Sequence, residues 1–342
     1  MAKILRRGVY VFLTLALMWV IFWWQAHPLV AVAGGFCLLV GFAPVLGIQF
    51  LTIWKVNRRY SSPQATLWQH ISAWWAEVVL TVKVFVGQQA YREHRFGDTI
   101  APIQARPVLI GAVQTGARLS PSGVENEGFP KKQRGIVFIH GFLCNRGFWN
   151  PWLQRLQRAN TPYLAISLEP VFTSIDEYAP QIEKAVMQLT AHTGMPPLLV
   201  CHSMGGLSAR AWLRTDSAHA LRVSHIVTIG TPHHGTGIVR GPSFAANATQ
   251  MQKNSAWITA LAADESAGQP GTASLETQDS ATPTGRVNPY AHFTCFYSNC
   301  DNIVFPTQTA TLDGADNRFA PGLAHVQMAF DETVMRESLA KL

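Results

Sequence analysis

A single serine in the C-terminal half lies at a sharp turn between a strand and a helix. Residues 198–201 are apolar and few enough for a buried strand, and a helix-like segment begins at Met204. Ser203 lies between them. Gly205 and Cys201 stand two residues to either side, where small residues let a strand and a helix approach. Such a turn exposes the serine hydroxyl as a nucleophile. The alternative is a tight turn that carries an inert serine.

A serine hydroxyl is a poor nucleophile unless a base removes its proton and an acid holds that base in the right tautomer. Asp301 follows a predicted strand at 293–297, and His325 comes 24 residues later, just before the last predicted helix. The chain order is therefore nucleophile, acid, base. Asp313 and Asp316 are alternative candidates for the acid. Without a catalytic role, the aspartate would cap a loop and the histidine would form hydrogen bonds at the surface. We expect Asp301 and His325 to complete a catalytic triad with the serine.

Acyl transfer also requires two backbone N–H groups that bind the oxyanion of the tetrahedral intermediate. Met204 follows the serine and supplies the first by its position. The second donor comes after an early strand. Residues 136–139 form a short apolar run, and His140, Gly141 and Phe142 follow it. We therefore expect the N–H groups of Phe142 and Met204 to form an oxyanion hole.

The elements that would position these residues begin near Arg134. Apolar runs predict five strands, at 136–139, 163–167, 198–201, 226–229 and 293–297, and helical spacing predicts helices at 152–158, 177–191 and 331–340. This alternation predicts an α/β fold with a mostly parallel, doubly wound sheet. Residues 236–291 form a cap or lid insertion that contains a polar tract at 264–286. A mobile lid and a static cap both fit this composition.

The motifs resemble those of the bacterial lipases of the α/β-hydrolase superfamily. Blocks at 139–142, 201–206, 228–236 and 297–304, and a closing block at 312–325, occur in that family's order. The resemblance covers residues 134–342. It implies an α/β-hydrolase fold and ester hydrolysis, with Ser203, Asp301 and His325 as the triad and Phe142 and Met204 as oxyanion donors. Ala324 stands where many members have a glycine. We expect no cofactor and no metal.

The first 60 residues predict a transmembrane helical hairpin. Residues 8–26 and 29–54 are uncharged and apolar, and each is about long enough to span a bilayer. This segment contains no acid but six cations, which leave only +1 of the net charge of +7 for the rest of the chain: Lys3, Arg6, Arg7, Lys55, Arg58 and Arg59. The positive-inside rule places both flanks in the cytoplasm, and tilt or a kink at Pro44 would absorb the extra length of the second run. The excess positive charge flanks the two apolar runs and does not form a basic face on a folded domain. We therefore expect no nucleic-acid partner. A cleaved signal peptide ending near Ala33 is the alternative.

Residues 61–133 predict an amphipathic helix and a linker. Apolar residues recur at helical spacing through 63–91, but Glu77 and Lys83 would lie near the centre of a span, at about 2.5–3.5 kcal/mol each. We therefore expect a helix in the membrane interface and a catalytic domain on the cytoplasmic side of a bacterial inner membrane. A helix packed on the soluble domain is one alternative. The other is a third span, which would move the domain across the membrane and would permit a disulfide between Cys295 and Cys300.

Composition agrees with a folded chain that has a membrane segment, because 48% of residues are hydrophobic and only 14% are charged. The sequence thus predicts a membrane-anchored serine hydrolase that cleaves carboxylic esters. Its expected partners are a lipid-like ester substrate and membrane lipid, and no protein partner can be named. A catalytically silent domain that serves as a membrane-bound interaction module is the alternative from another class. A thioesterase or a polyester depolymerase would use the same residues.

Overall fold

A six-stranded parallel sheet forms the centre of the C-terminal domain in the computed structural model, which describes residues 1–100, 133–239, 241, 243–267 and 288–342. The strand order is β2-β1-β3-β4-β5-β6, and every neighbouring pair is parallel. The strands are β1 Ile136–Ile139, β2 Tyr163–Ile166, β3 Leu198–His202, β4 His225–Ile229, β5 Phe293–Tyr297 and β6 Asp316–Phe319. The predicted fold class is confirmed.

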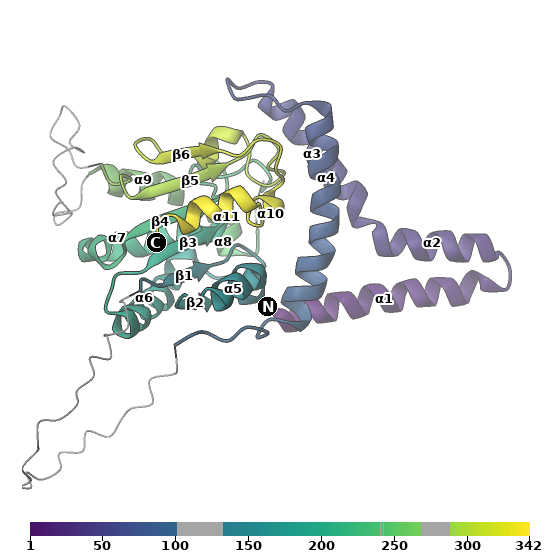
Figure 1. Ribbon diagram of the computed structural model, residues 1–342. Coiled ribbons are helices and arrows are strands. Elements are labelled where there is room, and N and C mark those ends of the chain that lie inside the picture. Colours follow the sequence, from purple (N-terminus) through teal and green to yellow (C-terminus); the bar gives the residue numbers. More distant parts are fainter. Residues whose placement is uncertain (101–132, 240, 242, 268–287) are drawn as a thin grey trace, which may run out of the picture.

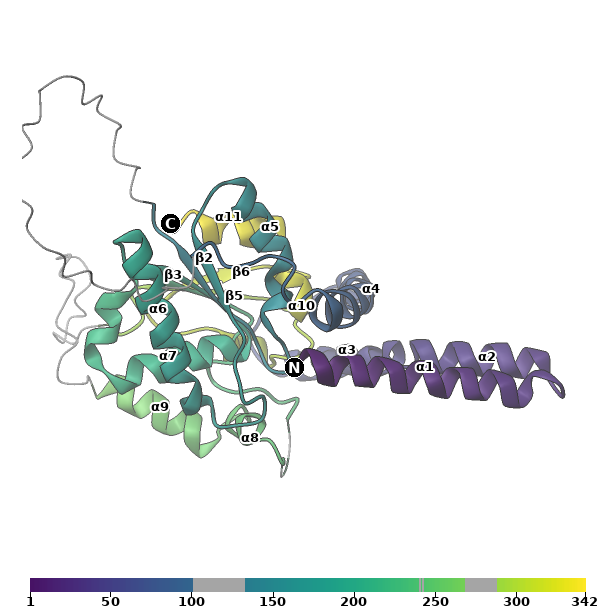
Figure 2. The ribbon, with the colours of Figure 1, turned by 90° about the horizontal axis from the view of Figure 1, so that it is seen from below.

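Helices cover both faces of this sheet (Figures 1 and 2). Alternate residues of β1 point to opposite faces: Val137 and Ile139 join one buried cluster, and Ile136 and Phe138 join the other. The first cluster includes buried side chains of α6 (Ala179–Thr193) and α7 (Met204–Thr215). The second includes buried side chains of α5 (Asn150–Arg158) and α11 (Glu332–Leu339). Burial on both faces explains why the strands read as continuous apolar runs.

The edge strand β6 was missing from the sequence-based prediction. Its residues are polar or charged except for Phe319, and three of the four are exposed. No apolar run could therefore reveal it. The remaining helices of the domain are α8 Ala246–Gln250, α9 Ala256–Ser266 and α10 His325–Met328, with 3₁₀ turns η2 Arg146–Trp149, η3 Ile175–Tyr178, η4 Ser217–Arg222 and η5 Thr307–Ala310.

The helices α8 and α9 belong to the described part of the expected cap or lid, and α9 is the longer of the two. It buries Ile258 and Leu261 against the domain, and its cap residue Ser255 accepts a hydrogen bond from the Ile258 N–H at 3.2 Å. The predicted polar tract at 264–286 lies mostly outside the described residues.

The chain begins with the helices α1 Ala2–Trp24, α2 Pro28–Val40 and α3 Phe42–Asn57. Among the described residues, α1 is the helix that is long and apolar enough to cross a membrane by itself, and α2 and α3 reach that length only if their pair, bent by 49°, is counted as one span. The sequence predicts one long helix here, either tilted or kinked at Pro44. The break falls at Gly41 instead, because a proline disrupts the turn that precedes it.

The helices α1 and α2 lie side by side and antiparallel (Figures 1 and 2). The indole Nε1 of Trp19 donates a hydrogen bond to the Val30 carbonyl at 3.1 Å. A side chain at Gly34 would overlap the same indole, since its Cβ would lie 2.0 Å from Nε1. The glycine therefore lets the tryptophan pack between the two helices.

The helix α4 (Leu67–Thr81) continues into the π-helix η1 (Val82–Gln89) and runs along one side of the sheet domain (Figure 1). His70, Ala73 and Glu77 are buried on its inner face. Its outer face is apolar and exposed: Leu67, Trp68, Ile71, Trp75 and Val79. The segment thus packs on the domain through one face and leaves an apolar face free.

Candidate active site

The turn at Ser203 has the strained backbone that the sequence predicts. Ser203 joins β3 to α7 with φ 54° and ψ −126°, a conformation that residues other than glycine rarely adopt. Its N–H donates to the Ile229 carbonyl at 2.9 Å, and its carbonyl accepts the Thr231 hydroxyl at 2.9 Å. Gly205 is required because a Cβ there would lie 2.4 Å from the Ile139 carbonyl oxygen. Contacts from β1 and β4 therefore maintain the strain.

Asp301 and His325 form a buried pair. The Nδ1 of His325 lies 3.0 Å from both carboxylate oxygens of Asp301, and these residues are 5% and 2% exposed. Oδ1 of Asp301 also accepts the N–H groups of Ile303 and Val304, which fixes the carboxylate. Burial opposes a charged imidazole, but the neighbouring carboxylates outweigh it and raise the pKa of His325. Of the rival acids, Asp316 pairs with Arg318 and Lys341 instead.

His325 lies beside the ends of β3 and β4, against the residue that precedes Ser203. The ring of His202, next to Ser203, lies 4.6 Å from the ring of His325, and its Nε2 donates to the His325 carbonyl at 3.2 Å. A glycine at position 230 leaves room for His325 and Asp301, since a Cβ there would lie 3.1 Å from Nδ1 of His325. Among the described residues, the Ser203 hydroxyl makes no hydrogen bond. Catalytic hydrogen bonds are often long in structures without substrate.

The loop after β1 lies directly against the serine. A Cβ at Gly141 would lie 2.8 Å from Cβ of Ser203, so only glycine allows this approach. The next residue is Phe142. On the other side of the serine, Met204 begins α7, and the first N–H groups of a helix have no partner within it. Of the expected oxyanion donors, Met204 therefore adjoins Ser203 in the chain, and Phe142 follows the glycine that lies against it.

His140 holds this loop in place. Its Nδ1 donates to the Gly141 carbonyl at 2.8 Å, and its Nε2 accepts the Leu168 N–H at 2.9 Å. These roles require a neutral ring. Burial lowers the pKa of His140 to about 4, although the Gly141 carbonyl opposes the shift. The loop therefore keeps its hydrogen bonds at neutral pH.

Sequence reasoning missed a second acid at this site, Glu77 on α4. Its side chain is buried, and both carboxylate oxygens lie 3.2 Å from the N–H of Val326, the neighbour of His325. Burial raises the pKa of Glu77 to about 7, and His325 limits the rise. In the sequence this glutamate served only as a charge that disfavours a third span. No spacing rule links it to a partner 249 residues away.

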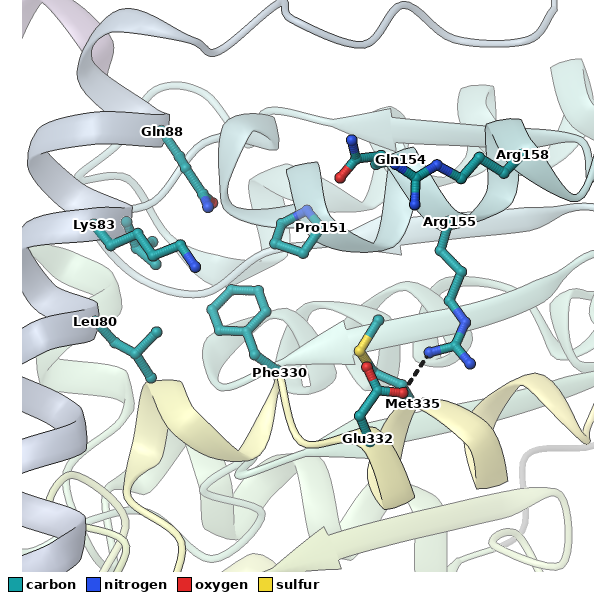
Figure 3. A pocket seen from close by; sticks show the side chains of 11 residues that line it. Leu80, Lys83, Gln88, Pro151, Gln154, Arg155, Arg158, Phe330, Glu332 and Met335 are labelled. Carbon is teal, nitrogen blue, oxygen red and sulfur yellow. Dashed lines mark hydrogen bonds and ion pairs between the residues drawn. The ribbon is translucent and has the colours of Figure 1, made fainter.

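A cavity of about 480 Å³ lies away from this site. It opens between η1, α5 and the C-terminal segment, where Lys83, Arg155 and Phe330 face it (Figure 3). None of the predicted site residues lines it.

Cys295 and Cys300 are buried free thiols. Within the described ranges, no three His, Cys, Asp or Glu side chains are grouped so as to hold a metal ion.

Residues 177–305 match the family model described as PGAP1-like alpha/beta domain. Among solved structures, the mature lipase of Bacillus licheniformis is 16% identical with a TM-score of 0.46, over 59% of this chain and 89% of that one. The monoacylglycerol lipase of Paleococcus ferrophilus is 14% identical with a TM-score of 0.39, over 61% and 97%. A search of curated proteins gave no match. Residues 177–305, which include β3, β4 and β5, are therefore similar to a PGAP1-like alpha/beta domain, in agreement with the α/β-hydrolase fold that the sequence predicts.

Proposed function

We propose that the protein is a membrane-anchored serine hydrolase that cleaves carboxylic esters with lipid-like acyl groups. Ser203 is the nucleophile, His325 the general base and Asp301 the acid that orients it. The observation that carries the proposal is the buried pair of His325 and Asp301 beside a serine whose backbone is strained. An inert turn gains nothing from such strain, whereas a nucleophile gains exposure of its hydroxyl.

The proposed reaction proceeds through an acyl-enzyme. Oγ of Ser203 attacks the ester carbonyl while Nε2 of His325 takes the hydroxyl proton. Asp301 holds the proton on Nδ1, so that Nε2 is free to act as the base. The N–H groups of Phe142 and Met204 stabilise the oxyanion, and the imidazolium then protonates the leaving alcohol. A water molecule activated by the same imidazole hydrolyses the acyl-serine and releases the acid.

A membrane location favours lipid-like substrates. The apolar helix α1 qualifies as a candidate anchor, and the outer face of α4 exposes Leu67, Trp68 and Trp75. Helices with such a face bind the boundary between headgroups and acyl chains. The inner face of α4 contacts α10, which begins at His325. The proposed site therefore lies one helix away from the surface that supplies lipids.

Labelling with a fluorophosphonate probe tests this proposal. The full-length protein in detergent should become labelled, and the Ser203→Ala variant should not. Ser208→Ala, which removes a buried hydroxyl one turn further along α7, is the matched control and should label normally. Turnover of p-nitrophenyl esters should follow the same pattern. Equal labelling of wild type and Ser203→Ala would reject the nucleophile. A folded wild type that neither labels nor turns over esters would favour the silent interaction module.

A further inference from the structure

We propose that Glu77 is a positioning residue for His325: from the N-terminal helix α4, its carboxylate binds the backbone beside the histidine and adds a second negative charge near the imidazole. This inference rests on the proposed function. It assigns a catalytic task to a helix that lies outside the α/β-hydrolase domain.

The first argument is the hydrogen bond between Glu77 and the histidine segment. Both oxygens of the glutamate lie 3.2 Å from the N–H of Val326, and the residue is 3% exposed. Val326 is the second residue of α10, a helix of four residues that begins at His325. A buried carboxylate in this position satisfies a backbone donor that the helix itself leaves unpaired. Loss of that acceptor would free the backbone next to the proposed base.

The second argument is that the neighbouring helix α3 also supports the histidine segment, through the side chain of Asn302. The N–H of His325 donates to Oδ1 of Asn302 at 3.2 Å, and the side-chain amide of Asn302 donates to Oε1 of Gln49 at 2.9 Å. Gln49 belongs to α3. Two successive backbone N–H groups, those of His325 and Val326, are therefore held by contacts that lead to α3 and α4. The N-terminal helices thus fix the histidine segment at two adjacent points.

The third argument concerns charge. The titratable groups that face His325 are Asp301 after β5, His202 at the end of β3 and Glu77 on α4. His202 is neutral, because burial and the neighbouring His325 lower its pKa well below the usual value. The negative charge around the imidazole thus comes from Asp301 and from Glu77 when it is ionised. Both charges stabilise the imidazolium that forms when the histidine takes the serine proton.

Three substitutions separate the hydrogen bond from the charge. Glu77→Gln keeps a carbonyl oxygen that can accept the Val326 N–H but removes the charge. Glu77→Ala removes both, and Glu77→Asp keeps the charge on a shorter side chain. Glu332→Gln is the matched control, since its carboxylate is exposed on α11 and pairs with Arg155. Each full-length variant is assayed in detergent with a p-nitrophenyl ester, and kcat is divided by the active fraction that the fluorophosphonate probe titrates.

For Glu77→Gln we expect kcat to fall roughly tenfold with KM unchanged. The acid limb of the pH profile of kcat/KM should move to lower pH, because the removed charge no longer raises the pKa of His325. Glu77→Ala should show the same shift and a larger loss of kcat. Glu77→Asp should keep the wild-type acid limb with a reduced kcat, and Glu332→Gln should match wild type in both measurements.

If wild type is active and both Glu77→Gln and Glu77→Ala match its kcat and its acid limb, this inference is wrong while the proposed function stands. A shifted acid limb in Glu77→Asp would also overturn it, since the charge is retained there. Should the Gln and Ala variants fail to fold, Glu77→Asp decides by its kcat, and a wild-type value rejects the positioning role. Failure of the proposed function has a different signature, because wild type itself would then remain unlabelled and inactive.

Discussion

His325 is surrounded by groups whose protonation states differ for identifiable reasons. Asp301 holds Nδ1 with both oxygens at 3.0 Å, and the neutral His202 ring donates to the carbonyl of His325. Raising the pKa of a buried histidine makes it a stronger base, but it also enlarges the protonated fraction that cannot accept the serine proton. Because the carboxylates of Asp301 and Glu77 both raise the pKa of His325, we expect the proposed activity to be favoured at neutral to alkaline pH.

Replacing Asp301 by asparagine should abolish most ester hydrolysis by the proposed site. The asparagine side chain no longer fixes the proton on Nδ1, so the imidazole presents the wrong nitrogen to Ser203, and kcat should fall by about 10⁴-fold. The acid limb of kcat/KM should also move to lower pH, because Asp301 raises the pKa of His325 in the folded protein. Steady-state kinetics from pH 5 to 9 measure both effects.

Asp313→Asn is the control for this substitution, since Asp313 is the rival acid that the structure leaves without a contact to His325 among the described residues. Its kinetics should match wild type. Full activity in Asp301→Asn together with a large loss in Asp313→Asn would move the acid to position 313.

At the scale of secondary structure, the sequence predicts what apolar periodicity controls and misses what polar contacts control. The five buried strands are predicted to within one residue at either end, because burial on both faces requires unbroken apolar runs. The edge strand β6 lacks such a signal. Pro44 indicates a bend in the sequence, but the break falls three residues earlier, at Gly41. Glu77 is the sharpest case: its charge is visible in the sequence, but the backbone it binds is distant in the chain. Its role depends on tertiary packing alone.

The helix α9 is held to the domain by a buried ion pair. Arg210 on α7 is fully buried, and its guanidinium donates to both carboxylate oxygens of Glu265, at 2.9 and 2.6 Å. A third donor bond reaches the His233 carbonyl at 2.8 Å. Together with the buried Ile258 and Leu261, these contacts favour a static cap at α9 over a mobile lid.

Removing the arginine should therefore destabilise the domain. Arg210→Met leaves Glu265 with a nearly buried and uncompensated charge, so we expect a loss of about 3–5 kcal/mol in the free energy of unfolding. Arg155→Met removes an exposed pair with Glu332 and should cost about 0–1 kcal/mol. Denaturant unfolding of both variants measures the difference. Similar small losses in the two variants would show that Glu265 is free to leave its site, as a mobile lid requires.

At the scale of the whole molecule, the N-terminal helices lie in two directions (Figures 1 and 2). The helices α1 and α2 project away from the hydrolase domain as an antiparallel pair, whereas α4 runs along the domain. A helix that buries Glu77 against a folded domain is not surrounded by lipid, which argues against a third span at α4. In our proposal, α1 and α2 enter the bilayer, and the outer face of α4 lies in the headgroup region.

This arrangement predicts a cytoplasmic catalytic domain. The start of α1 and the hydrolase domain lie at the same end of the projecting pair (Figure 1). Lys3, Arg6 and Arg7 lie in the first two turns of α1, and Lys55, Arg58 and Arg59 lie at the end of α3 or just after it. The positive-inside rule therefore predicts that this end faces the cytoplasm. A protease added to intact spheroplasts should leave the domain whole and should digest it after detergent permeabilisation. Digestion in intact spheroplasts, with a cytoplasmic marker protein still protected, would place the domain outside and would require a third crossing.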